Sequence, residues 1–143
     1  MNLKNKLLPN KEQIKAFVKE DLGTPVHMVN LLKFKDRAEY EDGRETDLTG
    51  QEAYAIYSAE IKGHIEKVGG QIIFEGQASQ LLVGEVDDLW DMIAIVMYPD
   101  VQAMMKMTSA RAYDDIAIHR IAGLEGQLNI KTLEGPLAPL PKV

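Results

Sequence analysis

The sequence predicts an α+β fold of the ferredoxin-like type, with the order β-α-β-β-α-β and one extra helix at the N-terminus. Segments typical of helices alternate with segments typical of strands, and the strands are apolar on both faces. A chain of 143 residues, 45% hydrophobic and 27% charged, suits one globular domain. We therefore expect a single domain over residues 1–143, with a core at about 24–133, a helical extension at 1–23 and a proline-rich tail at 134–143.

The first third of the chain predicts a helix, a strand and a long loop. Asn10 and Gln13 have the spacing of a reciprocal capping box, so we expect a helix over Asn10–Asp21. Val26–Lys35 is rich in Val, Leu and Phe and predicts a strand. Asp36–Thr49 is acidic and has no periodicity, so we expect a long, exposed, mobile loop near the rim of any pocket.

The middle of the chain predicts a long helix and a hairpin. Thr49 and Glu52 have the spacing of a second capping box. Apolar residues then recur every three or four positions, until Gly69-Gly70 ends the helix. Gln71–Ala78 and Gln80–Glu85 are both typical of strands, and the short connection between them predicts that they pair.

The last third predicts a strand, a broken helix, a final strand and a tail. Trp90–Tyr98 is the clearest strand of the chain, and Asp100 can cap the helix that follows it. Ser109 interrupts that helix and can cap a further stretch over Ala110–Ala122. Gln127–Leu133 alternates as a strand does, and the tail after it contains three prolines.

The strands predict a partner for one face of the sheet. Crossovers of the usual hand place the helices on one face only. Alternate residues of Trp90–Tyr98 are nevertheless apolar on both sides, and so are those of Val26–Phe34. A second copy of the chain is the simplest cover, which predicts a homodimer. The N-terminal helix or the tail could instead cover this face within one chain.

Composition excludes several classes of function. The chain has no cysteine, so disulfides, thiol nucleophiles, iron–sulfur clusters and cysteine-ligated zinc are ruled out. Its net charge of −6 disfavours binding to nucleic acid. We find no signal-peptide pattern and no apolar stretch long enough to cross a bilayer, so we expect a cytoplasmic protein without a membrane partner. A protein exported without a leader would look the same.

Five short segments together resemble an uncharacterised family, domain of unknown function 1330. They are, in chain order, Val29–Lys35, Leu48–Tyr57, Gly69-Gly70, Tyr98-Pro99 and His119–Leu124. The resemblance implies the dimeric α/β-barrel superfamily, in which two ferredoxin-like sheets pack face to face. That superfamily includes cofactor-independent monooxygenases, other small enzymes and pure ligand binders. The resemblance assigns no catalytic role to any residue of this chain.

Histidine and arginine provide the first candidate functional residues. His27, His64 and His119 show no metal-ligand spacing, so we expect no metal site. His119 is a candidate catalytic residue beside Arg120. An arginine on a partly buried helix face needs an anion, which can be an internal carboxylate or the carboxylate of a ligand.

Two polar residues interrupt apolar strands. Asn30 lies in the middle of the first strand, where a buried amide must find partners. It could orient a ligand or bond a neighbouring backbone group. Glu75 interrupts the second strand. Buried without a cation it would hold its proton and could serve as a general base, whereas a cation such as Arg120 nearby would make it a structural anchor.

Aromatic residues can line a cavity or fill the core. Trp90 and Tyr98 are expected on one strand face, and Tyr54 and Tyr57 on the capped helix. A cavity of this kind is a usual small-molecule site, and an aromatic core is the alternative. The candidate ligand-binding residues are Asn30, Tyr57, Trp90 and Arg120, and the candidate catalytic residues are Glu75 and His119. No nucleotide, flavin or haem motif is present in the sequence, so we expect no cofactor.

Two functions of different class remain open. The chain could be a cofactor-independent enzyme that acts on a small apolar or aromatic acid. It could instead be a non-catalytic homodimeric module that binds a small molecule or supports an assembly. The two differ in whether Asn30, Glu75 and Arg120 converge on one open cavity or satisfy one another.

Overall fold

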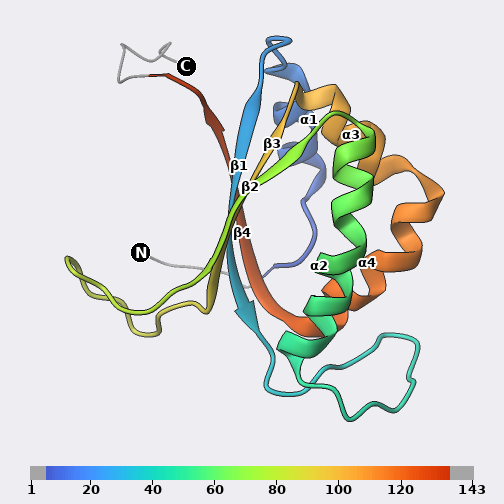
Figure 1. Cartoon of the computed structure of the whole chain (residues 1–143), viewed down its shortest axis with the longest axis vertical. Helices are drawn as coiled ribbons and strands as arrows, with labels where there is room; N and C mark the ends of the chain where they lie inside the picture. The colour runs from blue at the N-terminus through green and yellow to red at the C-terminus, as the bar shows by residue number, and fades with distance from the viewer. Residues whose placement is uncertain (1–5, 136–143) are drawn as a thin grey trace.

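The computed structural model describes residues 6–135, which form two layers (Figure 1). A four-stranded antiparallel sheet forms one layer, and the helices pack on one of its faces. The elements, in chain order, are α1 (Lys11–Lys19), β1 (Val26–Phe34), α2 (Gly50–Lys67), β2 (Gln71–Gln77), β3 (Met92–Tyr98), α3 (Val101–Ser109), α4 (Arg111–Gly123) and β4 (Leu124–Leu133). The predicted proline-rich tail lies almost entirely outside the described residues.

The strand order β2-β3-β1-β4 confirms the predicted ferredoxin-like α+β fold. Strands β1 and β3 occupy the centre, and each central strand pairs on both edges. Helix α2 connects β1 to β2, and the pair α3–α4 connects β3 to β4. The second crossover is broken in two, as predicted, but Ser109 is the last residue of α3 and Ala110 is the N-cap of α4.

Both predicted capping boxes are present. At α1 the Asn10 side chain accepts from the Gln13 backbone, and the Gln13 side chain accepts from the Asn10 backbone. Thr49 and Glu52 make the same reciprocal bonds at α2. These bonds satisfy backbone N–H groups that a helix start leaves without partners. The sequence pattern therefore locates both helix starts correctly.

The predicted strand at Gln80–Glu85 does not form. Strand β2 pairs with β3 instead, and the ladder ends where Gln77 faces Met92. The segment 80–85 is then left without a partner strand and lies within the long connection 78–91. Trp90 also lies in this connection, because β3 begins only at Met92. The apolar run at Leu81–Val83 indicated a strand, but no strand edge is available beside it.

The loop over Asp36–Thr49 has no regular secondary structure, as predicted, but its expected exposure is wrong in part. Ala38 and Tyr40 are buried. The Ala38 N–H donates to the Leu48 carbonyl at 3.0 Å, and the Glu39 N–H donates to the Ala122 carbonyl at the same distance. The loop therefore has its own small core against the end of α4.

The main core lies between the sheet and the helices. Tyr57, Ile61 and Ile65 of α2 pack on Met28 and Val96 of the central strands. Helices α2 and α4 approach closely at one end, where a Cβ added to Gly50 would lie 2.1 Å from the Lys35 carbonyl oxygen and 2.6 Å from that of Gly123. Because only a glycine fits there, the two helices can close over one end of the inner sheet face.

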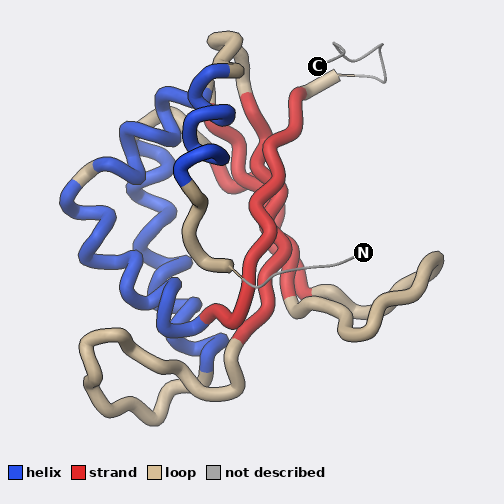
Figure 2. The backbone as a smooth tube through the Cα atoms, turned by 180° about the vertical axis from the view of Figure 1, so that it is seen from behind, coloured by secondary structure: helices blue, strands red, loops and turns tan. Residues whose placement is uncertain are grey.

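No helix formed by residues 6–135 lies over the other face of the sheet (Figure 2). Helix α1 lies on the same side as the other helices and packs against α3, so it does not cover this open face. Helix α1 contributes no buried residue to the core. Along β1, Val26, Met28, Asn30 and Leu32 are buried beneath the helices, and the alternate residues are only partly buried.

Candidate functional site

A row of polar side chains crosses the inner face of the sheet. In the strand register, Glu75 of β2 faces Ala94 of β3, Ala94 faces Asn30 of β1, and Asn30 faces Asn129 of β4. Directly paired residues point to the same side of a sheet. We call these four positions the inner row. Ala94 is the one small residue among them, and it is buried.

Asn30 is joined to Arg120 through one intermediate side chain. The Gln127 amide donates to Asn30 Oδ1 at 2.7 Å, and Arg120 Nη1 donates to Gln127 Oε1 at 2.6 Å. The Asn30 amide nitrogen donates at 3.3 Å to the Met28 and Ala94 carbonyls. The buried amide of Asn30 is thus fully occupied by protein groups. It connects the sheet to the guanidinium of α4.

The guanidinium of Arg120 is buried and lacks an acidic partner. The residue is 9% exposed, and among residues 6–135 it makes no salt bridge. Its Nη2 donates to the Leu7 carbonyl at 2.7 Å, and its buried Nε has no hydrogen-bond partner among the described residues. An internal carboxylate, one of the two anions expected from the sequence, is therefore not found beside it within residues 6–135. A buried charge held only by neutral groups is costly.

Tyrosine hydroxyls gather beside this guanidinium. The hydroxyls of Tyr57 and Tyr113 lie 3.4 Å apart between α2 and α4. Burial raises the pKa of Tyr54, the positive charge of Arg120 partly opposes this, and the negative charge of Glu75 adds to it. Burial likewise raises the pKa of Tyr57, and the neighbouring Tyr113 adds to that shift. The hydroxyls of Tyr54 and Tyr57 therefore stay protonated at neutral pH and act as hydrogen-bond donors rather than as bases.

Glu75 lies at the exposed end of the inner row. Its strand β2 is an edge of the sheet, and its carboxylate accepts a long hydrogen bond of 3.4 Å from the Ser58 hydroxyl of α2. The side chain is exposed. The burial on which a role as general base depended is therefore not met, and no contact joins Glu75 to Arg120 among the described residues.

His119 and Trp90 lie apart from this network. The Tyr40 hydroxyl is 2.7 Å from His119 Nδ1, so His119 secures the loop that follows β1. The two rings meet edge to face with centroids 5.5 Å apart. Trp90 is half-buried in the connection ahead of β3 and does not lie on the strand with Tyr98. Of the predicted site residues, the structure thus links Asn30 to Arg120 through Gln127, and the charge of Arg120 acts on Tyr57.

Two residues of the network were missed by sequence reasoning. Gln127 links Asn30 to Arg120, and the Leu7 carbonyl accepts from Arg120. Gln127 had a readable signal, because it is a polar residue at a position of β4 that faces the buried Leu32. Leu7 had no such signal in the sequence, because it contacts Arg120 through its backbone carbonyl, a group that every residue has. It belongs to the N-terminal segment that crosses the gap between α1 and the sheet (Figure 2).

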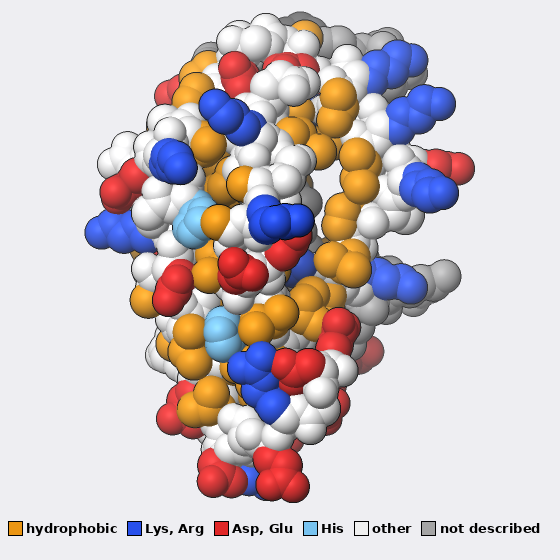
Figure 3. Space-filling view, turned by 90° about the vertical axis from the view of Figure 1, so that its right-hand side faces the viewer, with side chains coloured by type: hydrophobic (Ala, Val, Ile, Leu, Met, Phe, Trp, Pro, Cys, Tyr) orange, Lys and Arg blue, Asp and Glu red, His pale blue; other side chains and the backbone are white. Residues whose placement is uncertain are grey.

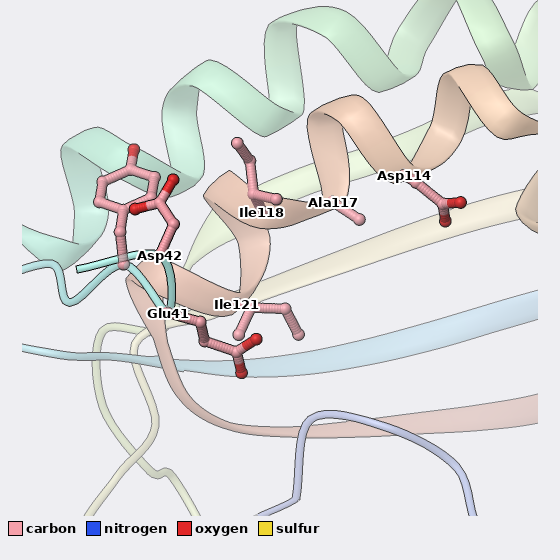
Figure 4. A pocket seen from close by; sticks show the side chains of 7 residues that line it. Glu41, Asp42, Asp114, Ala117, Ile118 and Ile121 are labelled. Atoms are coloured by element: carbon pink, nitrogen blue, oxygen red, sulfur yellow. The ribbon is translucent and has the colours of Figure 1, made fainter. Parts of the chain in front are cut away.

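The surface cavities lie elsewhere. An open cavity of about 490 Å³ is lined by Arg37, Glu45, Thr46 and Asp47. A smaller one of about 140 Å³ lies between α4 and the loop after β1, with Glu41, Asp42 and Asp114 around an apolar floor (Figure 4). Neither includes Asn30, Glu75 or Arg120. Within residues 6–135 no group of three or more acidic residues or histidines could hold a metal ion.

The chain is a small ferredoxin-like domain with a polar network, from Asn30 through Gln127 to Arg120, buried under its helices. Residues 43–133 match the family described as domain of unknown function DUF1330. The chain belongs to this family. The matched residues exclude β1, although Val29–Lys35 contributed to the resemblance seen in the sequence. The search of the curated proteins gave no match.

Solved structures extend the similarity over most of the chain. A protein of unknown function from Rhodopseudomonas palustris is 34% identical, with 95% of this chain and 100% of that chain aligned at a TM-score of 0.82. The methylated form of the same protein gives 36% identity, 97% and 100% coverage, and a TM-score of 0.83. A protein from Arabidopsis thaliana, 15% identical, aligns with 79% of this chain and 98% of its own at a TM-score of 0.52, which supports the fold alone. Among residues 6–135, no helix has the length and apolarity needed to span a membrane.

Proposed function

We propose that this protein is a homodimeric binding module for small organic acids with an apolar or aromatic body, and that Arg120 holds the ligand carboxylate. One observation carries the proposal. The Arg120 guanidinium is buried, has no acidic partner among the described residues, and retains a buried Nε without any partner. A ligand carboxylate would neutralise this charge and accept the free N–H, which the neutral groups around it do not do.

The surroundings of Arg120 fit the rest of such a ligand. Tyr54 and Tyr57 offer aromatic surface, and the hydroxyl of Tyr57 lies beside that of Tyr113. Apolar walls with a few polar groups that fix orientation are the usual composition of a small-molecule site. The site is closed in this structure, so a ligand must enter where the N-terminal segment lies. Its carboxylate would replace the Leu7 carbonyl on Nη2, because a charge-assisted hydrogen bond is the stronger of the two.

The homodimer forms on the open face of the sheet. Phe74 and Ile130 are 53% and 46% exposed there, and half-buried apolar residues of β1 and β3 lie between them. Apolar surface of this extent on a soluble protein is typical of an interface. A two-fold partner would present the same face and bury both. Helix α1 lies on the opposite side of the sheet, so it offers no cover in its place.

A cofactor-independent enzyme is the second candidate function. One observation favours it: the charges of both Glu75, on β2, and Arg120, on α4, act on the Tyr54 hydroxyl. Against it, Asn30 and most of Arg120 are satisfied by protein groups, and Glu75 is exposed. Sustained turnover of an acid that binds at Arg120, lost in a Glu75→Gln variant that still binds the acid, would favour the enzyme.

Thermal shift with matched probes tests the binding proposal. Benzoate should raise the melting temperature in proportion to the logarithm of its concentration, whereas the neutral benzamide should not. The Arg120→Met variant should lose the response to benzoate. Arg111→Met, on an exposed residue of the same helix, is the matched control and should keep it. Phenylacetate and longer aromatic acids extend the series. Equal responses of Arg120→Met and Arg111→Met would overturn the proposal.

A further inference from the structure

The connection between β2 and β3, residues 78–91, projects away from the body of the protein. We call it the β2–β3 arm. It leaves the end of the sheet and extends on the side opposite to the helices, in both ribbon views (Figures 1 and 2). Leu82 is 98% exposed and Val83 is 85% exposed, with Leu81 and Val86 also exposed beside them. The tip of the arm is thus apolar and has no cover within the described residues.

The root of the arm is fixed in direction. The Ala78 N–H donates to the Asp91 carbonyl at 2.9 Å, which joins the two ends of the arm. The Asp91 N–H donates to the Leu32 carbonyl at 2.8 Å, and its carboxylate accepts from the Phe34 N–H at 2.8 Å. Asp88 also pairs with Lys33 of β1 at 2.5 Å. These bonds tie the root to β1, so the orientation of the arm is a property of the fold.

We propose that the β2–β3 arm is an intersubunit arm that packs its apolar tip against a second copy of the chain. This inference rests on the homodimer proposed above. The arm extends on the side of the sheet that this dimer would occupy, and its root is bonded to the strand at the centre of that face. Leu81, Leu82 and Val83 would then be buried on the partner, as apolar side chains at the centre of an interface usually are.

The charge of the arm disfavours an anionic membrane surface as its target. Residues 78–91 contain no lysine or arginine, and they contain Glu85, Asp87, Asp88 and Asp91. Surface segments that insert apolar residues into anionic membranes carry basic residues beside them. Acidic residues beside an apolar tip would be repelled by such a surface. A protein surface with apolar and basic groups fits this chemistry, and the second copy is the one that the direction of the arm brings near.

Site-specific cross-linking tests the contact directly. The chain has no cysteine, so Leu82→Cys introduces a unique thiol at the tip. Labelled with a benzophenone maleimide and irradiated, this variant should give a covalent dimer on a denaturing gel. Leu22→Cys, on a residue 68% exposed in the connection before β1, is the matched control and should remain monomeric on the gel. A Leu82→Cys protein that forms no covalent dimer, under conditions where it is dimeric by sedimentation, would overturn the arm contact.

The dimer dissociation constant provides the second measurement. Leu82→Asp should raise this constant by about a hundredfold or more, because two-fold symmetry removes two buried leucines from each dimer. Leu22→Asp should leave it unchanged within about twofold. An unchanged constant in Leu82→Asp, together with dissociation by a charge on the open face, would reject the arm and keep the homodimer. A parent protein that is monomeric at micromolar concentration would reject the homodimer itself.

Discussion

Two rows of paired residues cross the sheet, offset from each other by one residue along each strand. One row is polar and the other is apolar. The inner row consists of Glu75, Ala94, Asn30 and Asn129. The adjacent row on the open face consists of Phe74, Ile95, Val29 and Ile130, which also face one another in register. The polar row therefore lies under the helices and the apolar row faces outward, the reverse of what a monomer with one wet face would show.

This difference shows what each face requires. The inner face is covered by the chain's own helices, and its polar residues are tolerated where they find partners, as Asn30 does in Gln127. Among the described residues, the Nε of Arg120 above it still lacks a partner. The open face has apolar residues and no cover from the part of the chain that the structure describes. The inner face thus lacks an anion for Arg120, and we propose that a ligand supplies it. The open face lacks a protein surface to cover it, and we propose that a second copy of the chain does so.

The Ile95→Asp substitution on the open face should have the largest effect. Ile95 lies at the centre of the outward row, between Val29 and Phe74. Two-fold symmetry would place two unpaired carboxylates in the interface, so the dimer dissociation constant should rise by about a thousandfold or more, measured by sedimentation equilibrium. Ile118→Asp, on an exposed residue of α4 in the helix layer, is the control and should leave the constant unchanged. Equal constants for both variants would place the interface elsewhere.

The Gly50→Ala substitution tests how closely the helix layer is packed over the inner face. The added Cβ would collide with backbone carbonyl oxygens, which cannot move without separating α2 from α4. We expect a loss of about 3 kcal/mol or more in the free energy of unfolding, measured with urea. Gly63→Ala is the matched control in the same helix, because nothing lies within 4 Å of its added Cβ. It should gain about 0.5–1 kcal/mol from better helix propensity.

Much of this arrangement could be predicted from the sequence because it depends on local rules. Capping residues located the starts of α1 and α2, and runs of apolar residues located β1 and β3. Because these runs lack polar residues at alternate positions, they also indicated that both faces of the strands are apolar. The strand predicted at Gln80–Glu85 was wrong because strand formation also needs a free neighbouring edge, and that depends on long-range pairing. The exposed arm was therefore not predicted.

Residues of the candidate site could be predicted from the sequence, but the hydrogen bonds that link them could not. Asn30 and Arg120 were selected because polar residues on apolar elements need partners. Their actual link, Gln127, comes from β4, and the Leu7 carbonyl comes from a segment more than a hundred residues away. Glu75 was expected to be buried or paired and is neither, because β2 proves to be an edge strand. Whether such a side chain is buried depends on whether its strand lies at the edge or at the centre of the sheet, and the sequence alone does not give this position.

The Arg120→Met substitution should lower stability moderately and abolish the binding of benzoate. It removes the donors to Gln127 and Leu7 but also relieves a buried charge, so we expect a loss of about 1–2 kcal/mol in the free energy of unfolding. Breaking a buried ion pair would cost about 3–5 kcal/mol. Denaturant unfolding distinguishes the two, with Arg111→Met as the control. A loss in the larger range would mean that Arg120 pairs with an internal carboxylate after all.

Tyr57→Phe should have the smallest effect at neutral pH and a distinct one in alkali. At pH 7 it removes one hydroxyl that contacts Tyr113, a cost of about 1 kcal/mol. Burial raises the pKa of Tyr57 well above its usual value, so the folded state binds its proton more tightly than the unfolded chain does. The stability linked to this proton is fully present below the unfolded-state pKa of about 10 and is lost as pH rises towards the folded-state value.

The parent should therefore lose stability above pH 10 more steeply than Tyr57→Phe does, because the variant has one buried phenol fewer to ionise on unfolding. Urea unfolding at a series of pH values from 8 to about 11 measures the two slopes. Ser58→Ala is the control: it removes one hydroxyl from the same helix without removing an ionisable phenol, and it should keep the slope of the parent. If Tyr57→Phe also keeps the parent's slope, the Tyr57 phenol is open to water. The proposal that the helices close the inner face of the sheet to water, in contrast to the open face, would then be refuted.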